Sequence, residues 1–183
     1  MNHSEPVNPR SLRTRRNAAP FHRSAIAAEI SGCADIGMKK EALRAVHTVL
    51  GKRRILPEEF AEAHRAIGVF SNFEKWKCKL EAAYARQSRK FKQEMRPYMV
   101  ELYGSIGAWE TALRFLSVRN PSSASEMFFG MEALLELDKL EDAKALAIEC
   151  TKALESATNA FDQSLLVTAL GEFLHRTKRG LKR

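Results

Sequence analysis

Apolar residues recur at helical spacing along almost the whole chain. From Ala25 onward they follow the pattern i, i+3, i+4 and i+7, and no run of alternating β-branched residues interrupts it. This spacing places apolar side chains on one face of successive α-helices, whereas a half-buried strand needs alternation with a period of two. The chain is therefore predicted to be all-α.

Local signals mark where the helices begin and end. Pro57 precedes two glutamates, which fits the first turn of a helix, where proline is tolerated and acids face the positive end of the dipole. Ser123 with Glu126 forms a candidate capping box. Asn159 is predicted to open the last helix, and Gly180 lies where that helix should have ended.

A short segment that joins a turn to the start of a helix recurs four times. Its copies span residues 37–43, 71–77, 107–113 and 138–144. The aligned residues are separated by 34, 36 and 31 positions, and they are Ala42, Trp76, Ala112 and Ala143. Another apolar helix precedes each turn, at about 24–36, 57–70, 97–106 and 123–137, and a final helix is predicted at about 159–177. The period indicates a repeat of helix hairpins.

At these residues the chain resembles the tetratricopeptide repeat family, whose unit has a turn glycine, an aromatic residue two positions later and a small alanine after that. The resemblance covers residues 24–177 and is carried by Gly107, Trp109 and Ala112, then Leu140 and Ala143, then Gly37 and Ala42. It implies an α-solenoid of about four antiparallel helix hairpins plus a C-terminal closing helix. Trp76 occupies a small-residue position, so the second hairpin should be splayed. The other small-residue position of the unit holds Ile30, His64, Val100 and Met131.

The resemblance also implies a general mode of action. In the family, the first helices of the hairpins line a concave groove that binds peptides, and this function needs no cofactor. A non-enzymatic adaptor or scaffold for a protein or peptide partner is therefore expected. The alternative is that the groove side chains are merely solvated. The family's groove positions correspond here to Ser31, Arg65, Glu101 and Glu132, and Phe128 is expected beside them.

The net charge of +8 is unevenly distributed. A basic N-terminal tail (residues 1–23), expected to be flexible, and a basic C-terminal tail (residues 178–183) flank a nearly neutral helical domain (residues 24–177). Within that domain, residues 39–96 carry 15 basic and 7 acidic side chains, whereas residues 97–175 carry 5 and 12. A partner that complements a positive and a negative half is favoured, and another copy of the chain would do so.

One predicted helix, beginning near Phe73, carries a basic stripe opposite its apolar face. The stripe is a solvated face, a contact for an acidic protein surface, or a contact for phosphates together with the basic tails. The last interpretation gives the alternative function, an RNA- or DNA-associated helical repeat protein that binds nucleic acid non-specifically. Ser88 is a candidate break in this helix. The stripe consists of Lys75, Lys79, Arg86, Arg89 and Lys90.

Signals for chemistry are missing from the sequence. It contains no phosphate-binding glycine loop, no nucleophile elbow and no His or Cys spacing typical of a metal site, so neither catalysis nor a metal is expected. The three cysteines lie in apolar helical contexts and are expected to be buried, reduced thiols of a cytoplasmic protein. No apolar run is long enough to span a membrane. The Arg-rich start leaves a mitochondrial targeting segment as an alternative.

Overall fold

The computed structural model describes residues 24–180, and within them every regular element is an α-helix, which confirms the predicted class. The N-terminal tail (1–23) and the last three residues of the C-terminal tail (181–183) lie outside the described residues. Residues 178–180, predicted to be part of that tail, instead belong to α10, so the helical domain extends past the expected boundary at 177. The helices are α1 (Ala25–Asp35), α2 (Lys39–Gly51), α3 (Pro57–Phe70), α4 (Phe73–Ala85), α5 (Arg89–Glu94), α6 (Arg96–Ser105), α7 (Trp109–Phe115), α8 (Ala124–Glu136), α9 (Leu140–Ser156) and α10 (Ala160–Gly180).

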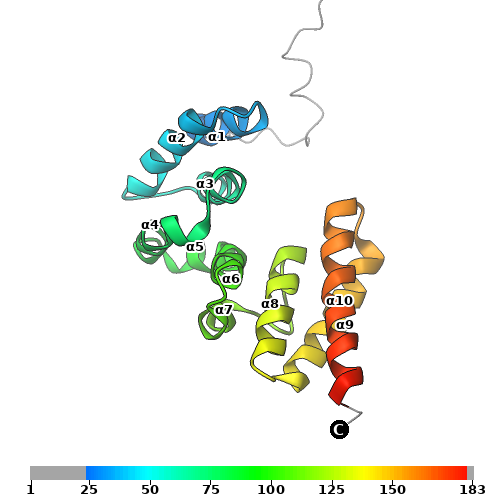
Figure 1. Cartoon of the computed structure of the whole chain (residues 1–183). Helices are drawn as coiled ribbons and strands as arrows, with labels where there is room; N and C mark the ends of the chain where they lie inside the picture. The colour runs from blue at the N-terminus through cyan, green and yellow to red at the C-terminus, as the bar shows by residue number, and fades with distance from the viewer. Residues whose placement is uncertain (1–23, 181–183) are drawn as a thin grey trace, which may run out of the picture.

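The helices follow one another along a curved path, from α1 and α2 at one end to α9 and α10 at the other (Figure 1). Helix α1 packs on α2 and α3, α6 packs on α7 and α8, and α8 packs on α9 and α10. The backbones of α3 and α4 approach each other at only a few positions. Trp76 of α4 is buried with its ring centroid 4.5 Å from that of the His47 ring of α2, and its indole Nε1 donates to the Ser71 hydroxyl at 3.1 Å. The α3 and α4 backbones thus approach each other at fewer positions than those of α1 and α2 or of α6 and α7, as splayed helices would.

Three of the four predicted turns have the same backbone geometry. Gly37, Gly107 and Asp138 adopt positive φ values of 77°, 71° and 53°. In each turn the following residue donates its backbone N–H to the carbonyl five positions earlier, as Met38 does to Cys33. This is the Schellman motif, in which a left-handed residue satisfies the last carbonyls of a helix. The second turn differs, because Ser71 is extended and the Asn72 side chain caps α4 by accepting from the Lys75 N–H.

The left-handed turn predicts opposite effects of one substitution at two glycines. Gly107→Ala should lower the free energy of unfolding by about 1–2 kcal/mol, because a Cβ is strained at positive φ. Gly171→Ala, in the exposed middle of α10 with open space around it, should raise it by about 0.5–1 kcal/mol. Urea denaturation of both variants measures the difference, and equal effects would contradict the role of the turn.

The residues aligned in the repeat lie in the core. Both small-residue positions are at most 8% exposed in every unit, including His64 and Trp76. The core forms two clusters of buried residues, one contributed mainly by α1 to α7 and one by α8 to α10, and Leu113 packs against both. Gly104 of α6 lies so close to α8 that a Cβ there would be 2.7 Å from the Phe129 Cβ.

Two details of the sequence interpretation need correction. The basic stripe does not lie on one helix, because α4 ends at Ala85 and Ser88 caps the separate helix α5 by accepting from the Phe91 N–H. Arg89 and Lys90 therefore belong to α5. Of the three cysteines, Cys150 is buried as expected, but Cys33 is only partly covered and Cys78 is exposed.

Candidate functional site

A groove with polar walls and an apolar edge lies between helices from both halves of the chain. It consists of two adjoining pockets of about 530 and 420 Å³ that share Tyr98, Glu101 and Ser125. Its walls come from α3, α4, α6, α8 and α10. We call this site the concave groove. The structure brings together two of the groove residues named from the sequence, Arg65 and Glu101.

Arg65 is held by three polar partners on α1 and α3. Its Nε donates to Glu62 at 2.9 Å, and its two terminal nitrogens lie 3.4 Å from an Asp35 carboxylate oxygen and 3.1 Å from the Ser31 hydroxyl. Ser31, a third residue named from the sequence, is only 7% exposed and therefore supports the arginine from beneath. Arg65 itself is 41% exposed, so one cationic group faces the groove in a fixed position.

A buried histidine, His64, and a partly exposed glutamate, Glu101, lie side by side in the groove wall. The His64 ring is 2% exposed and packs against the rings of Phe73 and Tyr98, with centroids 4.4 and 5.1 Å away. Its Nδ1 lies 4.0 Å from a Glu101 carboxylate oxygen, and its Nε2 has no hydrogen-bond partner among the described residues. Burial lowers the pKa of His64 to about 3 and raises the pKa of Glu101 to about 7, because it penalises the charged form of each. The histidine is neutral at physiological pH.

Exposed apolar side chains form one edge of the groove. Val69 at the end of α3 is 59% exposed, and Phe161 at the start of α10 is 68% exposed. Both line the larger pocket together with the Arg65 side chain. Together these two side chains give the larger pocket an exposed apolar edge.

Phe128 and Glu132 of α8 lie outside the two pockets, so the predicted groove set is divided. Phe128 packs on the Phe129 ring at a centroid distance of 5.0 Å and against the C-terminal core cluster. Glu132 is half-buried, and burial together with Glu172 and Glu136 raises its pKa. The mapping from the tetratricopeptide resemblance requires α8 to continue the groove lined by α3 and α6. Among the residues of α8, however, only Ser125, near its start, lines the two pockets.

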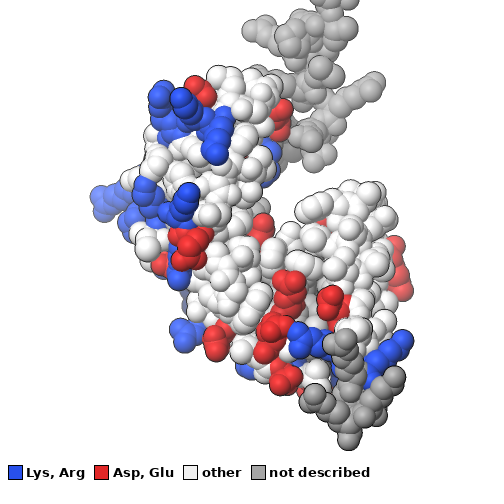
Figure 2. Space-filling model, in the orientation of Figure 1, with Lys and Arg blue, Asp and Glu red and all other residues white. Residues whose placement is uncertain are grey.

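The groove carries an excess of negative charge. Three glutamates line its pockets, Glu62, Glu94 and Glu101, against the single cation Arg65. In Figure 2 acidic side chains gather beside α8 and toward the hollow of the arc, while Lys and Arg gather over α2 and α4. The separation of charge expected from the sequence is therefore seen as an acidic surface, at the groove and beside α8, and a basic surface elsewhere.

Sequence reasoning missed several of the groove's residues. The sequence identified His64 only as a large residue in a small-residue position of the repeat, which predicts an effect on helix packing and not a place in the groove wall. Tyr98 and Phe161 carried no signal, because their place in the groove depends on the curvature that brings α10 opposite α3. In the part of the chain that the structure describes, no three His, Cys, Asp or Glu side chains are placed to hold a metal ion.

The basic stripe contacts the protein itself at two of its five residues. The Lys79 ammonium lies 5.3 Å from the centre of the Trp76 ring and 3.0 Å from a His47 ring nitrogen. Arg86 donates to the Leu50 carbonyl at 2.7 Å. These contacts fix the direction of both side chains without neutralising either charge.

Comparisons with protein-family models, with curated proteins and with solved structures found no match to this chain. Among residues 24–180, no helix combines the length and the low polarity that crossing a membrane requires.

Proposed function

We propose that the protein is a non-enzymatic cytoplasmic adaptor that holds a peptide segment of a protein partner in the concave groove. In this proposal the chain is an α-solenoid of tetratricopeptide type. Its hairpins are α1/α2, α3/α4, α6/α7 and α8/α9, and α10 closes the array. Stacked hairpins form a continuous core and a curved surface, which suits binding of an extended or helical segment without a cofactor.

The observation that carries this proposal is the combination of side chains in one groove. Phe161 and Val69 offer exposed apolar surface, whereas Glu101 and Glu62 give the groove an acidic wall. A peptide with an apolar side chain beside a lysine or arginine would bury the first against Phe161 and place the second near Glu101. Exposed aromatic residues are typical anchors of binding energy in such interfaces.

Peptide selection on the full chain tests the proposal. Random peptides displayed on phage and selected on the wild-type protein should converge on sequences that combine an apolar and a basic residue. Binding of a selected peptide should weaken at least tenfold in Phe161→Ala, because loss of a central anchor costs about 1.4 kcal/mol or more. Isothermal titration calorimetry measures the change in Kd.

Ile148→Ala is the matched control, because Ile148 on α9 is 57% exposed and lines neither groove pocket. Its affinity for the same peptide should equal that of the wild type. Selection that yields no binding peptide, or peptides whose affinity survives Phe161→Ala, would overturn the assignment of the groove.

A further inference from the structure

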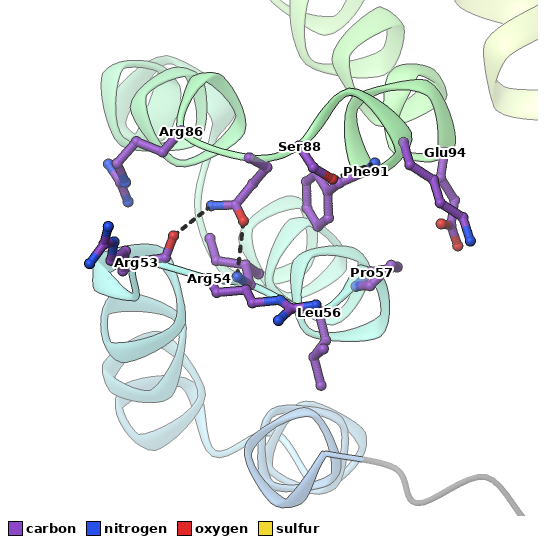
Figure 3. A pocket seen from close by; sticks show the side chains of 11 residues that line it. Arg53, Arg54, Leu56, Pro57, Arg86, Ser88, Phe91 and Glu94 are labelled. Atoms are coloured by element: carbon purple, nitrogen blue, oxygen red, sulfur yellow. Dashed lines mark hydrogen bonds between the residues drawn. The ribbon is translucent and has the colours of Figure 1, made fainter.

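A third pocket, of about 620 Å³, lies between the connection from α2 to α3 and the connection from α4 to α5. Four basic side chains line it: Arg53 and Arg54 from the first connection, Arg86 from the second, and Lys90 from the first turn of α5 (Figure 3). We call this site the basic pocket. It shares only Glu94 with the concave groove.

Hydrogen bonds fix the two sides of the basic pocket to each other. The Gln87 side-chain oxygen accepts from the Ile55 N–H at 3.1 Å, and its nitrogen donates to the Arg53 carbonyl (dashed lines in Figure 3). The same nitrogen also donates to the Ala83 carbonyl in α4. Arg86 donates to the Leu50 carbonyl across the same junction. The pocket is therefore formed before any ligand arrives, which lowers the entropy cost of binding.

The charge of the basic pocket is not compensated within residues 24–180. None of its four cations forms an ion pair with a carboxylate there, and Glu94 is the one acidic residue that lines the pocket. By contrast, Lys52 beside it is paired with Glu59 at 2.7 Å, and Arg96 is paired with Glu126. Like charges gathered in a hollow raise the local positive potential and attract anions.

The cations continue beyond the pocket in one direction. Lys75 and Lys79 lie on the same face of α4 as Arg86, since they precede it by eleven and seven positions, which are about three turns and two turns of helix. At the rise of a helix this row is about 16 Å long. Leu56, which is 41% exposed, adds an apolar wall at the pocket end. A row of cations leading into a hollow with an apolar wall fits an extended polyanion better than a single compact anion.

We propose that the basic pocket binds the sugar–phosphate backbone of a single-stranded nucleic acid, with the strand continuing along α4. Arg53, Arg54, Arg86 and Lys90 neutralise phosphates in the pocket, and Lys79 and Lys75 neutralise those that follow. Contacts with phosphates do not read the base sequence, so binding is non-specific and depends steeply on salt. The acidic side chains of the C-terminal half confine the strand to the N-terminal half.

The test measures binding of a fluorescently labelled oligouridylate to the full chain by anisotropy, over a series of salt concentrations. The double variant Arg53→Ala/Arg54→Ala should bind at least tenfold more weakly. Its slope of log affinity against log salt should be lower by one to two units than that of the wild type, about one for each lost phosphate contact. Circular dichroism should show an unchanged helix content, because both side chains are exposed.

Lys144→Ala/Lys152→Ala is the control, since it removes the same charge from exposed positions on α9, outside the pocket. It should bind the oligonucleotide like the wild type. Equal losses in both double variants, or no loss in either, would mean that net charge or the basic tails bind the strand, and would overturn the proposal. Absence of binding at low salt would also overturn it. A serine phosphopeptide and inorganic phosphate, titrated as competitors, should displace the strand only weakly. Tight binding of either would mean that the pocket recognises a single compact phosphate group, and would overturn the proposal.

Discussion

Replacing Arg96 with methionine is expected to lower the free energy of unfolding by about 3–5 kcal/mol, because it leaves a buried carboxylate without its counter-ion. That carboxylate belongs to Glu126, which is completely buried. An Arg96 terminal nitrogen lies 3.1 Å from one Glu126 oxygen. A lone charge in the protein interior is among the most destabilising features that a single substitution can create.

Glu126 also organises the segment that joins the two core clusters. Its carboxylate accepts hydrogen bonds from the Ser117 N–H at 3.2 Å and from the Ser122 N–H and hydroxyl at 2.8 and 3.0 Å. The candidate capping box is half present, because the Ser123 hydroxyl accepts from the Glu126 N–H while the Glu126 side chain reaches Ser122 instead. The ion pair therefore connects α6 to the start of α8 and to the chain between α7 and α8.

Two comparisons isolate the effect of the buried charge. Arg176→Met removes the partner of Glu136 in an exposed pair and should cost less than about 1 kcal/mol. The double variant Arg96→Met/Glu126→Gln should be less destabilised than the sum of its single variants, because neither charge remains. Urea denaturation measures all four. A loss for Arg96→Met no larger than for Arg176→Met would contradict the role of the buried pair.

The second large effect expected is a pH dependence that appears only when His64 or Glu101 is replaced. Below pH 6.5 the unfolded chain binds a proton at His64 that the folded chain excludes, because the folded pKa is about 3, so this group makes stability fall as the pH falls. Between pH 4.5 and about 7 the folded chain holds a proton at Glu101 that the unfolded chain has lost, so this group makes stability fall as the pH rises. Between pH 4.5 and 6.5 the two effects oppose each other and nearly cancel.

Each single variant should uncover the effect of the other group. Relative to the wild type, Glu101→Gln should lose about 2 kcal/mol of stability as the pH is lowered from 6.5 to 4.5, since each pH unit contributes at most about 1.4 kcal/mol and Glu101 is partly exposed. His64→Phe should lose a similar amount as the pH is raised over the same interval. Denaturation at several pH values measures both slopes.

His175→Gln, at an exposed position on α10, serves as the control and should follow the wild-type profile. If stability changed with pH in the same direction in both groove variants, the lowered pKa of His64 and the raised pKa of Glu101 would be contradicted. Their absolute stabilities do not enter the test, because each variant is compared with itself across pH.

The sequence predicted the helices well because their determinants are local. Pro57, the N-cap at Ser123 and the turn glycines Gly37 and Gly107 act within one or two turns of the backbone, so a pattern of neighbouring residues is sufficient to place them. Ser88, the candidate break, does separate two helices, because its hydroxyl caps α5 while the apolar spacing continues to Phe91.

The sites were less predictable because they depend on contacts between distant residues. Arg65 and Glu101 could be named from the family register, but Phe161 reaches the same groove only through the curvature of the whole array. Arg53 and Arg54 lie in a connection without periodicity, and their approach to Arg86 depends on hydrogen bonds of Gln87. No pattern along the chain records such a contact.

The order of packing along the curved path has a consequence for synthesis on the ribosome. Every extensive backbone contact joins helices that are neighbours or next neighbours in the chain. A nascent chain can therefore bury most of the N-terminal cluster while α9 and α10 are still to be made, and local contacts of this kind close quickly. The first cluster needs from later segments little beyond Ala133 of α8. Arg96 is synthesised before Glu126, so the ion pair that connects α6 to the start of α8 can form only after α8 has begun to emerge.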